Sequence, residues 1–264
     1  MSQRMHGFLS KLSKSGVHET MFGDVELIDA YDSDGEKVTL LKLDESLQSA
    51  TYHGKWWHYP PFAYIRAFDH LFEADTARHG FGMGPVDNIL LLGGGGFSYT
   101  KHVLASRSDI TMDVVEIDPA IVRLARRHLY LDRLERLLLM EGRLDHLEIF
   151  IEDGVDHLKS SEASYDAIIN DTFAGARAVL ELLDETAIGL VKDHLRDGGM
   201  FLSNFVVDFT KEGPSELNRF VEKLASAFSY VHIVDACDEE FGGADNYIVI
   251  ASDASYEFSD VIPF

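Results

Sequence analysis

The sequence predicts an α/β fold in which a small N-terminal β-rich domain precedes an open, doubly wound sheet of seven strands. Three observations lead to this prediction. From residue 86 onward, short apolar segments alternate with amphipathic helical stretches. The first of these segments, residues 89–92, runs directly into four consecutive glycines. Before residue 83, paired apolar runs and an aromatic-rich stretch replace this alternation.

The N-terminal part is expected to begin with a β-hairpin. Residues 25–31 and 37–43 are apolar runs, and the segment between them contains an Asp-Gly pair typical of hairpin turns. An aromatic-dense stretch follows, and its second half, residues 63–72, has apolar residues at helical spacing. The glycine-rich run at 80–85 interrupts regular structure. We therefore expect one unit at 1–83 and a Rossmann-like, nucleoside-binding catalytic unit at 84–264.

The second unit has the signature of a parallel sheet that helices cover on both faces. A helix is expected at residues 119–131, another is indicated by the apolar stripe from Leu180 to Leu195, and a third opens at Pro214. The predicted strands lie at residues 89–92, 112–117, 147–151, 167–169, 200–207, 230–234 and 246–251.

The composition is strongly acidic, with 45 Asp and Glu against 23 Lys and Arg and a net charge of −22. Such a surface repels phosphate backbones and anionic lipid, so we expect no nucleic-acid or membrane partner. It favours a cationic partner, although excess charge can also serve solubility alone. Cys237 is the only cysteine and the histidines show no ligand spacing, so no metal site is expected. Since no apolar run reaches ~18 residues and no signal peptide is evident, we expect a cytoplasmic protein.

The strongest local signal is the glycine quartet Gly93, Gly94, Gly95 and Gly96 at the end of the first predicted strand. Glycines at this position let the backbone turn tightly and approach a ligand closely. Glu116 follows 23 residues after Gly93, at the end of the second predicted strand. A carboxylate there can accept hydrogen bonds from ribose hydroxyls, so the pair favours nucleoside binding over a plain turn.

The nucleoside is better explained as an S-adenosyl compound than as a dinucleotide. The sixth position of the loop is Ser98 instead of Gly or Ala, and the loop has no basic residue for a pyrophosphate. Asp118, followed by a proline, is interpreted as a helix cap. Asp153 and Gly154 end the third strand, where the aspartate either contacts an adenine edge or only forms a strand-to-helix turn.

Asp171 is the catalytic candidate because it ends the fourth predicted strand, beside the glycine loop. Ligands gather at the carboxyl ends of strands in open α/β sheets. A carboxylate there could accept a proton from an attacking amine, which at a pKa near ~10 is mostly protonated at neutral pH. The alternative is a second capping aspartate before a turn.

The order of LDESLQ (residues 43–48), LLLGGGG, VVEID, EDG and YDAIIND resembles that of the polyamine aminopropyltransferases, typified by spermidine synthase. The resemblance implies an S-adenosylmethionine-type Rossmann domain and a dimer. It also implies transfer of an aminopropyl group from decarboxylated S-adenosylmethionine to a small cationic amine, without a metal. It would make Gln48 a donor contact, Glu116 the ribose ligand, Asp153 the adenine contact, and Asp171 the residue that assists amine deprotonation.

The chain also departs from that family. Gly96 stands where the family's glycine loop has an aspartate, and Ala174 stands where a second aspartate follows the catalytic one. Tyr64 is the nearest match to the family's tyrosine near the acceptor. Asp235 and Asp238, in an acidic segment that also holds Glu239, Glu240 and Asp245, could restore an acidic amine site, although a solvated loop is the simpler interpretation.

These observations lead to the hypothesis of a spermidine synthase-like transferase with Asp171 as its catalytic residue. Two other functions stay open at this point. One is a methyltransferase of a small molecule that uses intact S-adenosylmethionine, since Gly96 removes an acid that would repel the donor's carboxylate. The other is a non-catalytic protein that binds adenosyl nucleosides. A nicotinamide oxidoreductase ranks below both.

Overall fold

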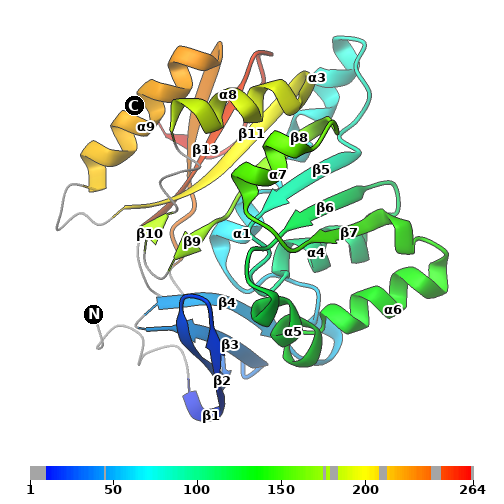
Figure 1. Ribbon diagram of the computed structural model, residues 1–264, viewed down its shortest axis with the longest axis vertical. Coiled ribbons are helices and arrows are strands. Elements are labelled where there is room, and N and C mark those ends of the chain that lie inside the picture. The colour runs from blue at the N-terminus through cyan, green and yellow to red at the C-terminus, as the bar shows by residue number, and fades with distance from the viewer. Residues whose placement is uncertain are drawn as a thin grey trace.

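The computed structural model describes residues 10–44, 46–174, 177–178, 184–207, 213–238 and 245–262. Its N-terminal part is a four-stranded antiparallel sheet of β1 (Ser10–Thr20), β2 (Gly23–Tyr31), β3 (Lys37–Leu43) and β4 (Ser46–Tyr52), in that order (Figure 1). The predicted hairpin is confirmed as β2 and β3. Its turn is closed by a bond from the Gly35 backbone N–H to the Asp32 carbonyl oxygen, and Gly35 has a φ of +82° that suits glycine.

The second part is a mostly parallel sheet, and all seven predicted strands are present in it. Their order is β12-β13-β11-β8-β5-β6-β7, and the two-residue strand β14 (Val261–Ile262) extends the β12 edge. Only β13 among these seven runs antiparallel, between β11 and β12. The bounds are β5 (Asn88–Leu92), β6 (Thr111–Val115), β7 (Leu147–Phe150), β8 (Tyr165–Asn170), β11 (Leu195–Val207), β12 (Tyr230–Asp235) and β13 (Asp245–Ser252).

Helices cover both faces of this sheet, which confirms the doubly wound α/β prediction (Figure 1). One face packs against α7 (Gly154–Ser160), α8 (Glu185–His194) and α9 (Gly213–Ala227). The other packs against α1 (Ala63–Ala67), α2 (His70–Glu73), α3 (Asp75–Gly80), α4 (Ser98–Ser106), α5 (Pro119–His128) and α6 (Leu131–Glu141). None of the helices described is long and apolar enough to cross a bilayer.

Several element predictions need correction. The expected helix at residues 63–72 is split into α1 and α2, because the backbone breaks its regular bonding around Phe68 and Asp69. The helix expected to reach residue 131 ends at His128, where Tyr130 adopts a left-handed φ of +63° and α6 begins. Strands β1 and β4 and helix α6 were not predicted, nor was the short pair β9 (Phe173–Ala174) and β10 (Arg177–Ala178). The start of the apolar stripe predicted from Leu180 to Leu195, residues 180–183, lies outside the described residues.

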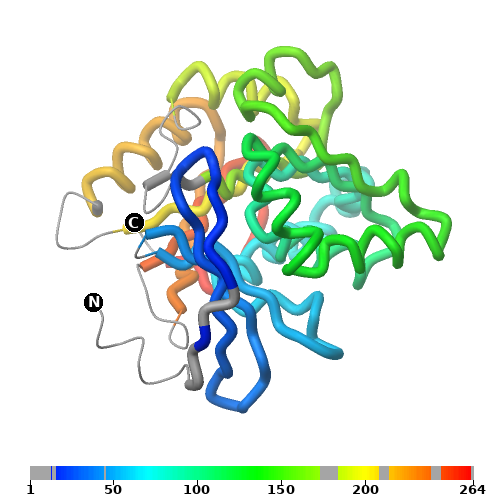
Figure 2. The backbone as a smooth tube through the Cα atoms, turned by 60° about the horizontal axis from the view of Figure 1, so that its bottom comes forward, coloured from blue at the N-terminus to red at the C-terminus, as the bar shows by residue number. Residues whose placement is uncertain are grey.

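The N-terminal sheet is docked on the larger one by an apolar contact and by buried polar bonds. Its β2 and β3 leucines pack on Leu124 and Leu129 at the end of α5, and Figure 2 shows the β1–β2 hairpin beside that helix. Lys101 of α4 is 1% exposed and donates from Nζ to Thr51 Oγ1 and to the Leu129 carbonyl oxygen, both at 2.5 Å. Burial lowers the pKa of this lysine to about 7.

A second buried contact crosses the predicted boundary at residue 83. Arg78 of α3 is 2% exposed and pairs with Asp166 at 2.6 Å, and its guanidinium also donates to the Gly198 carbonyl oxygen at 2.8 Å. These bonds join α3, which precedes residue 83, to the larger sheet that follows it. The division of the chain into two units at residue 83 stays a prediction.

Candidate active site

Four residues meet at the carboxyl edge of the sheet because their strands are in register. Leu92 of β5 is level with Val115 of β6 and with Asn170 of β8, and Asn170 is level with Ser203 of β11. The residues that follow, Gly93, Glu116, Asp171 and Asn204, therefore lie next to one another at the point where ligands gather in α/β sheets. Three of these four were predicted from the sequence.

Gly93 allows the glycine loop to pass directly against Asp171. Its φ is +94°, and a Cβ added there would lie 2.5 Å from the Asp171 carbonyl oxygen. The Asp171 backbone N–H donates to the Leu92 carbonyl oxygen at 2.8 Å, so the two loops are also hydrogen-bonded. Only glycine combines this backbone conformation with so close an approach.

Glu116 holds the glycine loop through its carboxylate. Oε2 accepts from the backbone N–H groups of Gly94 at 3.1 Å and Gly95 at 2.9 Å, and Oε1 accepts from that of Asp118 at 2.9 Å. Glu116 is 7% exposed. Burial raises its pKa, and the three N–H donors lower it but do not offset the burial. The carboxylate thus shapes the glycine loop, and its role as a ribose ligand stays a prediction.

The two aspartates beyond these strands are both helix caps. Asp118 Oδ1 accepts from the Ala120 backbone N–H at 2.7 Å, which confirms its predicted capping role, and Oδ2 accepts from the Met21 N–H at 2.6 Å. Asp153 caps α7, which begins at Gly154, and accepts through Oδ1 from the N–H groups of Val155 and Asp156. The strand-to-helix turn is therefore present, and the adenine contact of Asp153 stays a prediction.

The glycine loop also contacts the N-terminal sheet, next to Gln48. A Cβ at Gly96 would lie 2.1 Å from Ser49 Oγ, and that hydroxyl is 3.2 Å from Ser98 Oγ. Gln48 precedes Ser49 at an irregularity in the β3–β4 pairing, where Leu41 aligns with Ser49 and Lys42 with Leu47. Such bulges re-aim side chains near functional sites. Gln48 is thus brought to the loop, and its role as a donor contact stays a prediction.

Asp171 is half-buried and receives two side-chain donors. Asn204 Nδ2 donates to its Oδ1 at 2.9 Å, and the Tyr64 hydroxyl on α1 also hydrogen-bonds to it. Burial raises the pKa of Asp171 to about 7, and the two donors act in the opposite direction. Burial and the Asp171 charge raise the pKa of Tyr64 well above its usual value, so Tyr64 keeps its proton and donates it.

Asn204 was not predicted, although the sequence contains a signal for it. It is 2% exposed and, with Ser203, interrupts the otherwise apolar strand at residues 200–207. Because buried amides need hydrogen-bond partners, a polar pair inside a covered strand near its carboxyl end points to a site.

The two acidic residues proposed for the acceptor lie in different places. Asp238 Oδ2 accepts from the Ala63 backbone N–H at 2.8 Å, so it lies at the start of α1, one residue from Tyr64. Asp235 is level with Tyr247, which is level with Phe205. Since alternate residues face opposite sides of a sheet, Asp235 lies on the face opposite to Asn204. The structure therefore brings Asp238, but not Asp235, toward the Asp171 group.

The structure describes the acidic segment and the loop after Asp171 in part. Glu239, Glu240 and Gly175 lie outside the described residues. Among the residues that the structure describes, no group of three or more His, Cys, Asp or Glu side chains is arranged to hold a metal ion.

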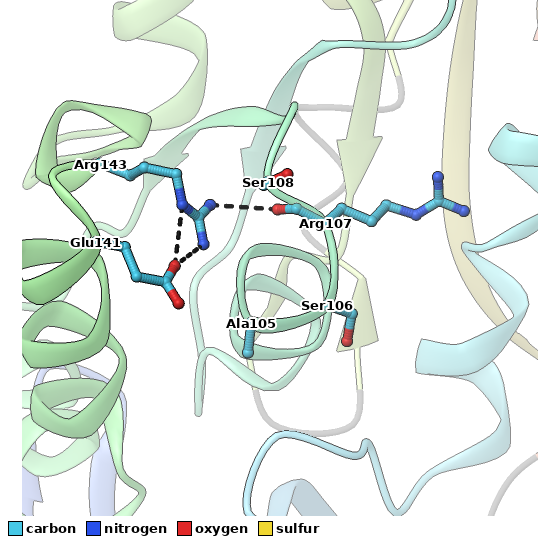
Figure 3. Close-up of a pocket in the computed structure, with 6 residues that line it drawn as sticks. All are labelled: Ala105, Ser106, Arg107, Ser108, Glu141 and Arg143. Atoms are coloured by element: carbon cyan, nitrogen blue, oxygen red, sulfur yellow. Dashed lines mark hydrogen bonds and ion pairs between the residues drawn. The ribbon is translucent and has the colours of Figure 1, made fainter.

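A surface pocket at the opposite end of α4 is separate from this site. It is lined by residues 105–108, Glu141 and Arg143, and Arg143 closes one side by its contacts with Glu141 and the Arg107 carbonyl oxygen (Figure 3). Because α4 runs from the glycine loop back toward the start of β6, this pocket lies at the amino edge of the sheet, away from Asp171.

Comparison with known proteins decides the family. Residues 79–245 match the model of the spermine/spermidine synthase domain. The chain belongs to this family. The resemblance drawn from the sequence motifs is thereby confirmed, and the departures at Gly96 and Ala174 mark a divergent member of the spermine/spermidine synthase family.

Individual relatives agree with this assignment. A polyamine aminopropyltransferase of Chromobacterium violaceum is 30% identical over 141 residues, 53% of this chain and 49% of that protein. One from Synechococcus sp. is 27% identical over 197 residues, 73% of this chain and 59% of that protein. The chain spans about half the length of the first of these relatives.

Solved structures support the fold. A probable spermidine synthase from Corynebacterium glutamicum has a TM-score of 0.69 at 20% identity and covers 92% of this chain and 81% of its own. Human methyltransferase-like protein 13 in complex with SAH has a TM-score of 0.58 at 17% identity and covers 74% of this chain and 84% of its own. The predicted S-adenosylmethionine-type Rossmann fold is thus confirmed.

Proposed function

We propose that this protein transfers an aminopropyl group from decarboxylated S-adenosylmethionine to a small cationic amine and releases methylthioadenosine. One observation carries the proposal. The glycine loop held by Glu116 and the half-buried carboxylate of Asp171 adjoin each other at one sheet edge, so a nucleoside on the first would present its sulfonium group beside the second. The names of the relatives, polyamine aminopropyltransferases, support the same reaction.

In this reaction, the lone pair of a neutral amine attacks the methylene carbon next to the sulfonium. The N–C bond forms, the C–S bond breaks, and its electron pair stays on sulfur, which becomes the neutral thioether of methylthioadenosine. Asp171 accepts the proton that the amine nitrogen loses. Because a sulfonium is already a good leaving group, orientation of the two reactants is the main contribution of the protein.

On the donor side, we assign Glu116 to the ribose, Asp153 to the adenine and Gln48 to the rest of the donor. A carboxylate offers about four lone-pair positions, so Glu116 can accept from a ribose hydroxyl in addition to its three backbone donors. Both capping bonds of Asp153 end on Oδ1, which directs its Oδ2 to other donors. On the acceptor side, we assign Tyr64 and Asp238. We no longer assign Asp235, because it ends strand β12 on the opposite face of the sheet.

A methyltransferase that uses intact S-adenosylmethionine is the second candidate. The observation that favours it is the neutral surroundings of Gly96, which lies against Ser49 and Leu129. None of the three atoms nearest to a Cβ added at Gly96 belongs to a carboxylate that would repel that of the intact donor. A non-catalytic protein that binds adenosyl nucleosides would use the same scaffold.

Calorimetric titration with decarboxylated S-adenosylmethionine, S-adenosylmethionine, methylthioadenosine and NADH separates these functions. We expect the decarboxylated donor and methylthioadenosine to bind more tightly than the intact donor. Preference for the intact donor would favour the methyltransferase, and binding of the nucleosides without turnover of any amine would leave the non-catalytic function. If no adenosyl compound binds, both enzyme hypotheses fail, and preference for NADH would indicate an oxidoreductase.

The same titration on Glu116→Gln tests the donor site. A glutamine amide presents its NH₂ group to either the glycine loop or the Asp118 N–H, and donor then faces donor. We expect methylthioadenosine affinity to fall at least ~10-fold, the low end for a hydrogen bond to a charged group. The matched control is Glu148→Gln, at an exposed glutamate of the adjacent strand β7, which should bind like the wild type. Equal affinity in both variants would remove Glu116 from the site.

We further propose that the protein acts in the cytoplasm as a homodimer. Sedimentation of the purified chain at several concentrations tests the oligomeric state, and a monomer at every concentration would contradict it.

A further inference from the structure

The antiparallel direction of β13 brings its first residues to the carboxyl edge of the parallel strands. Asn246, its second residue, is level with Val206 of β11, two positions beyond Asn204. Residues two apart on one strand face the same side of a sheet. Asn246 and Asn204 therefore share the face on which Asp171 and Tyr64 also lie.

These side chains form a directed hydrogen-bond series. Asn246 Nδ2 donates to Asn204 Oδ1 at 2.9 Å, and Asn204 Nδ2 donates to Asp171 Oδ1 at 2.9 Å. A carboxamide has one acceptor oxygen and one donor NH₂ group. Since Asn246 supplies a donor, it fixes the oxygen of Asn204 toward itself and the NH₂ group toward Asp171. Reversal of the Asn204 amide would break both bonds.

We propose that Asn204 and Asn246 are a positioning pair for Asp171, in which Asn246 sets the orientation of the Asn204 carboxamide and Asn204 holds the carboxylate ready to receive a proton. The pair acts through Asp171, and its role in catalysis rests on the proposed function. A carboxylate offers about four lone-pair positions, so with Asn204 and Tyr64 bound to Asp171 a position is still left for the proton of the acceptor nitrogen. An NH₂ donor also favours the ionised carboxylate, the form that accepts a proton.

The surroundings of Asp171 make this contribution measurable. From α1 the Tyr64 hydroxyl donates to the carboxylate, and from β11 the Asn204 amide does. Gly93, which follows β5, passes against the backbone carbonyl of Asp171 and not against its side chain. Tyr64 stays protonated at neutral pH, so the described groups that contact the Asp171 side chain are neutral donors. A change in the orientation of one amide should therefore alter the protonation of Asp171.

The sharpest test is Asn246→Asp, which alters the residue of the pair that does not touch Asp171. The carboxylate introduced at position 246 can only accept, so it should attract the Asn204 NH₂ group and turn the Asn204 oxygen toward Asp171. We expect the apparent pKa of Asp171 to rise by about one unit, because it loses a donor and gains a distant like charge. Asn246→Leu removes the donor without adding charge and should give a smaller rise in the same direction.

The Asp171 carboxyl is followed by carbon NMR of protein with labelled aspartate, and its signal is identified by its loss in Asp171→Asn. The matched control is Asn88→Asp, which introduces the same charge at the opposite end of β5 and should leave the titration unchanged. Thermal midpoints of all variants show which of them fold, and the half-buried position of Asn246 makes both of its variants milder than changes at Asn204.

An Asp171 titration that is identical in the wild type and in both Asn246 variants would overturn the proposal and leave the pair a structural contact. This readout does not need turnover. If the wild type transfers no aminopropyl group to any amine, the proposed function fails, while the NMR titration still decides whether the pair controls Asp171. In an active enzyme, the pKa seen in the pH profile of kcat should also rise in the Asn246 variants. Their affinity for methylthioadenosine should be unchanged.

Discussion

Asp171→Asn should lower kcat for aminopropyl transfer at least ~100-fold while methylthioadenosine still binds with nearly wild-type affinity. The asparagine keeps an oxygen for the Asn204 donor, so the local geometry is retained. It has no lone pair that can take the amine proton at neutral pH. Because Glu116 and the glycine loop are untouched, the nucleoside site should be intact. Steady-state kinetics and calorimetry with methylthioadenosine measure the two effects separately.

The control for this prediction is Asp184→Asn. Asp184 caps α8 through a bond from the Ala187 backbone N–H to Oδ1 at 2.8 Å, and asparagine caps helices about as well as aspartate. This variant should retain wild-type kcat. If Asp171→Asn turns over at the wild-type rate, Asp171 takes no part in the mechanism. If it loses both turnover and nucleoside binding, its role is to shape the site.

The pH dependence of transfer should report the same carboxyl. Burial raises the pKa of Asp171 to about 7, and only the ionised form accepts a proton. The kcat of the wild type should therefore rise with pH up to about 7 and then level off, and this limb should be absent from the residual activity of Asp171→Asn. A wild-type profile that is flat from pH 5 to 8, within roughly twofold, would contradict this assignment.

The contribution of Asp171 to the stability of the fold should fall as the pH rises, over the same range in which kcat rises. The pKa of Asp171 is raised in the folded state, so between its ordinary pKa of 3.8 and about 7 the folded chain binds this proton more tightly than the unfolded chain. Its contribution to stability is complete below that window and is lost as the pH rises through it. Asp171→Asn should accordingly unfold at a higher denaturant concentration than the wild type at pH 8. At pH 4 the difference should be smaller.

The parts of the fold that follow from the sequence are those with a local cause. Buried parallel strands such as 89–92 read as uninterrupted apolar runs, and the Asp-Gly turn before Lys37 is determined by four or five neighbouring residues. Strand β1 has no such pattern, because many of its residues are polar and it forms by pairing with β2. The break between α1 and α2 is also invisible locally, since the apolar spacing continues through Phe68.

The residues of the site also divide into those with a local sequence signal and those that depend on how distant elements pack. Gly93, Glu116 and Asp171 were predictable because each ends a strand, and parallel strands bring their ends together. Asn204 and Asn246 could not be paired in advance, because their contact depends on β13 inserting antiparallel between β11 and β12. The contact of Ser49 with Gly96 depends on how two separate sheets dock.

The contact between Ser49 and Gly96 also bears on position 96, where the family has an aspartate and this chain has a glycine. Gly96→Asp restores the family residue, yet we expect it to destabilise the fold by about 1–3 kcal/mol, the usual cost of overpacking a core. A Cβ at this buried position would lie 2.1 Å from Ser49 Oγ, 2.7 Å from Ser49 Cβ and 3.2 Å from Leu129 Cδ1. Urea unfolding measures the loss, and we expect no gain in affinity for the decarboxylated donor.

The clash with Ser49 also predicts its own suppressor. Ser49→Gly removes both of the serine atoms that obstruct position 96, so Ser49→Gly with Gly96→Asp should be more stable than the sum of the single changes predicts, with a coupling of at least ~0.5 kcal/mol. Gly95→Asp is the matched control. Nothing lies within 4 Å of its added Cβ, so Gly95→Asp carries the backbone strain of a φ of +48° without a clash, and Ser49→Gly should not suppress its loss of stability.

If Gly96→Asp instead folds with wild-type stability and binds the decarboxylated donor more tightly, β4 must move away from the loop, and the N-terminal sheet is not docked as described. If the suppressor works as expected, Gly96 and Ser49 are a coupled pair. The loss of the family's aspartate then follows from the close approach of β4 to the glycine loop. Donor selection in this protein would then depend on other residues of the site and not on a carboxylate at position 96.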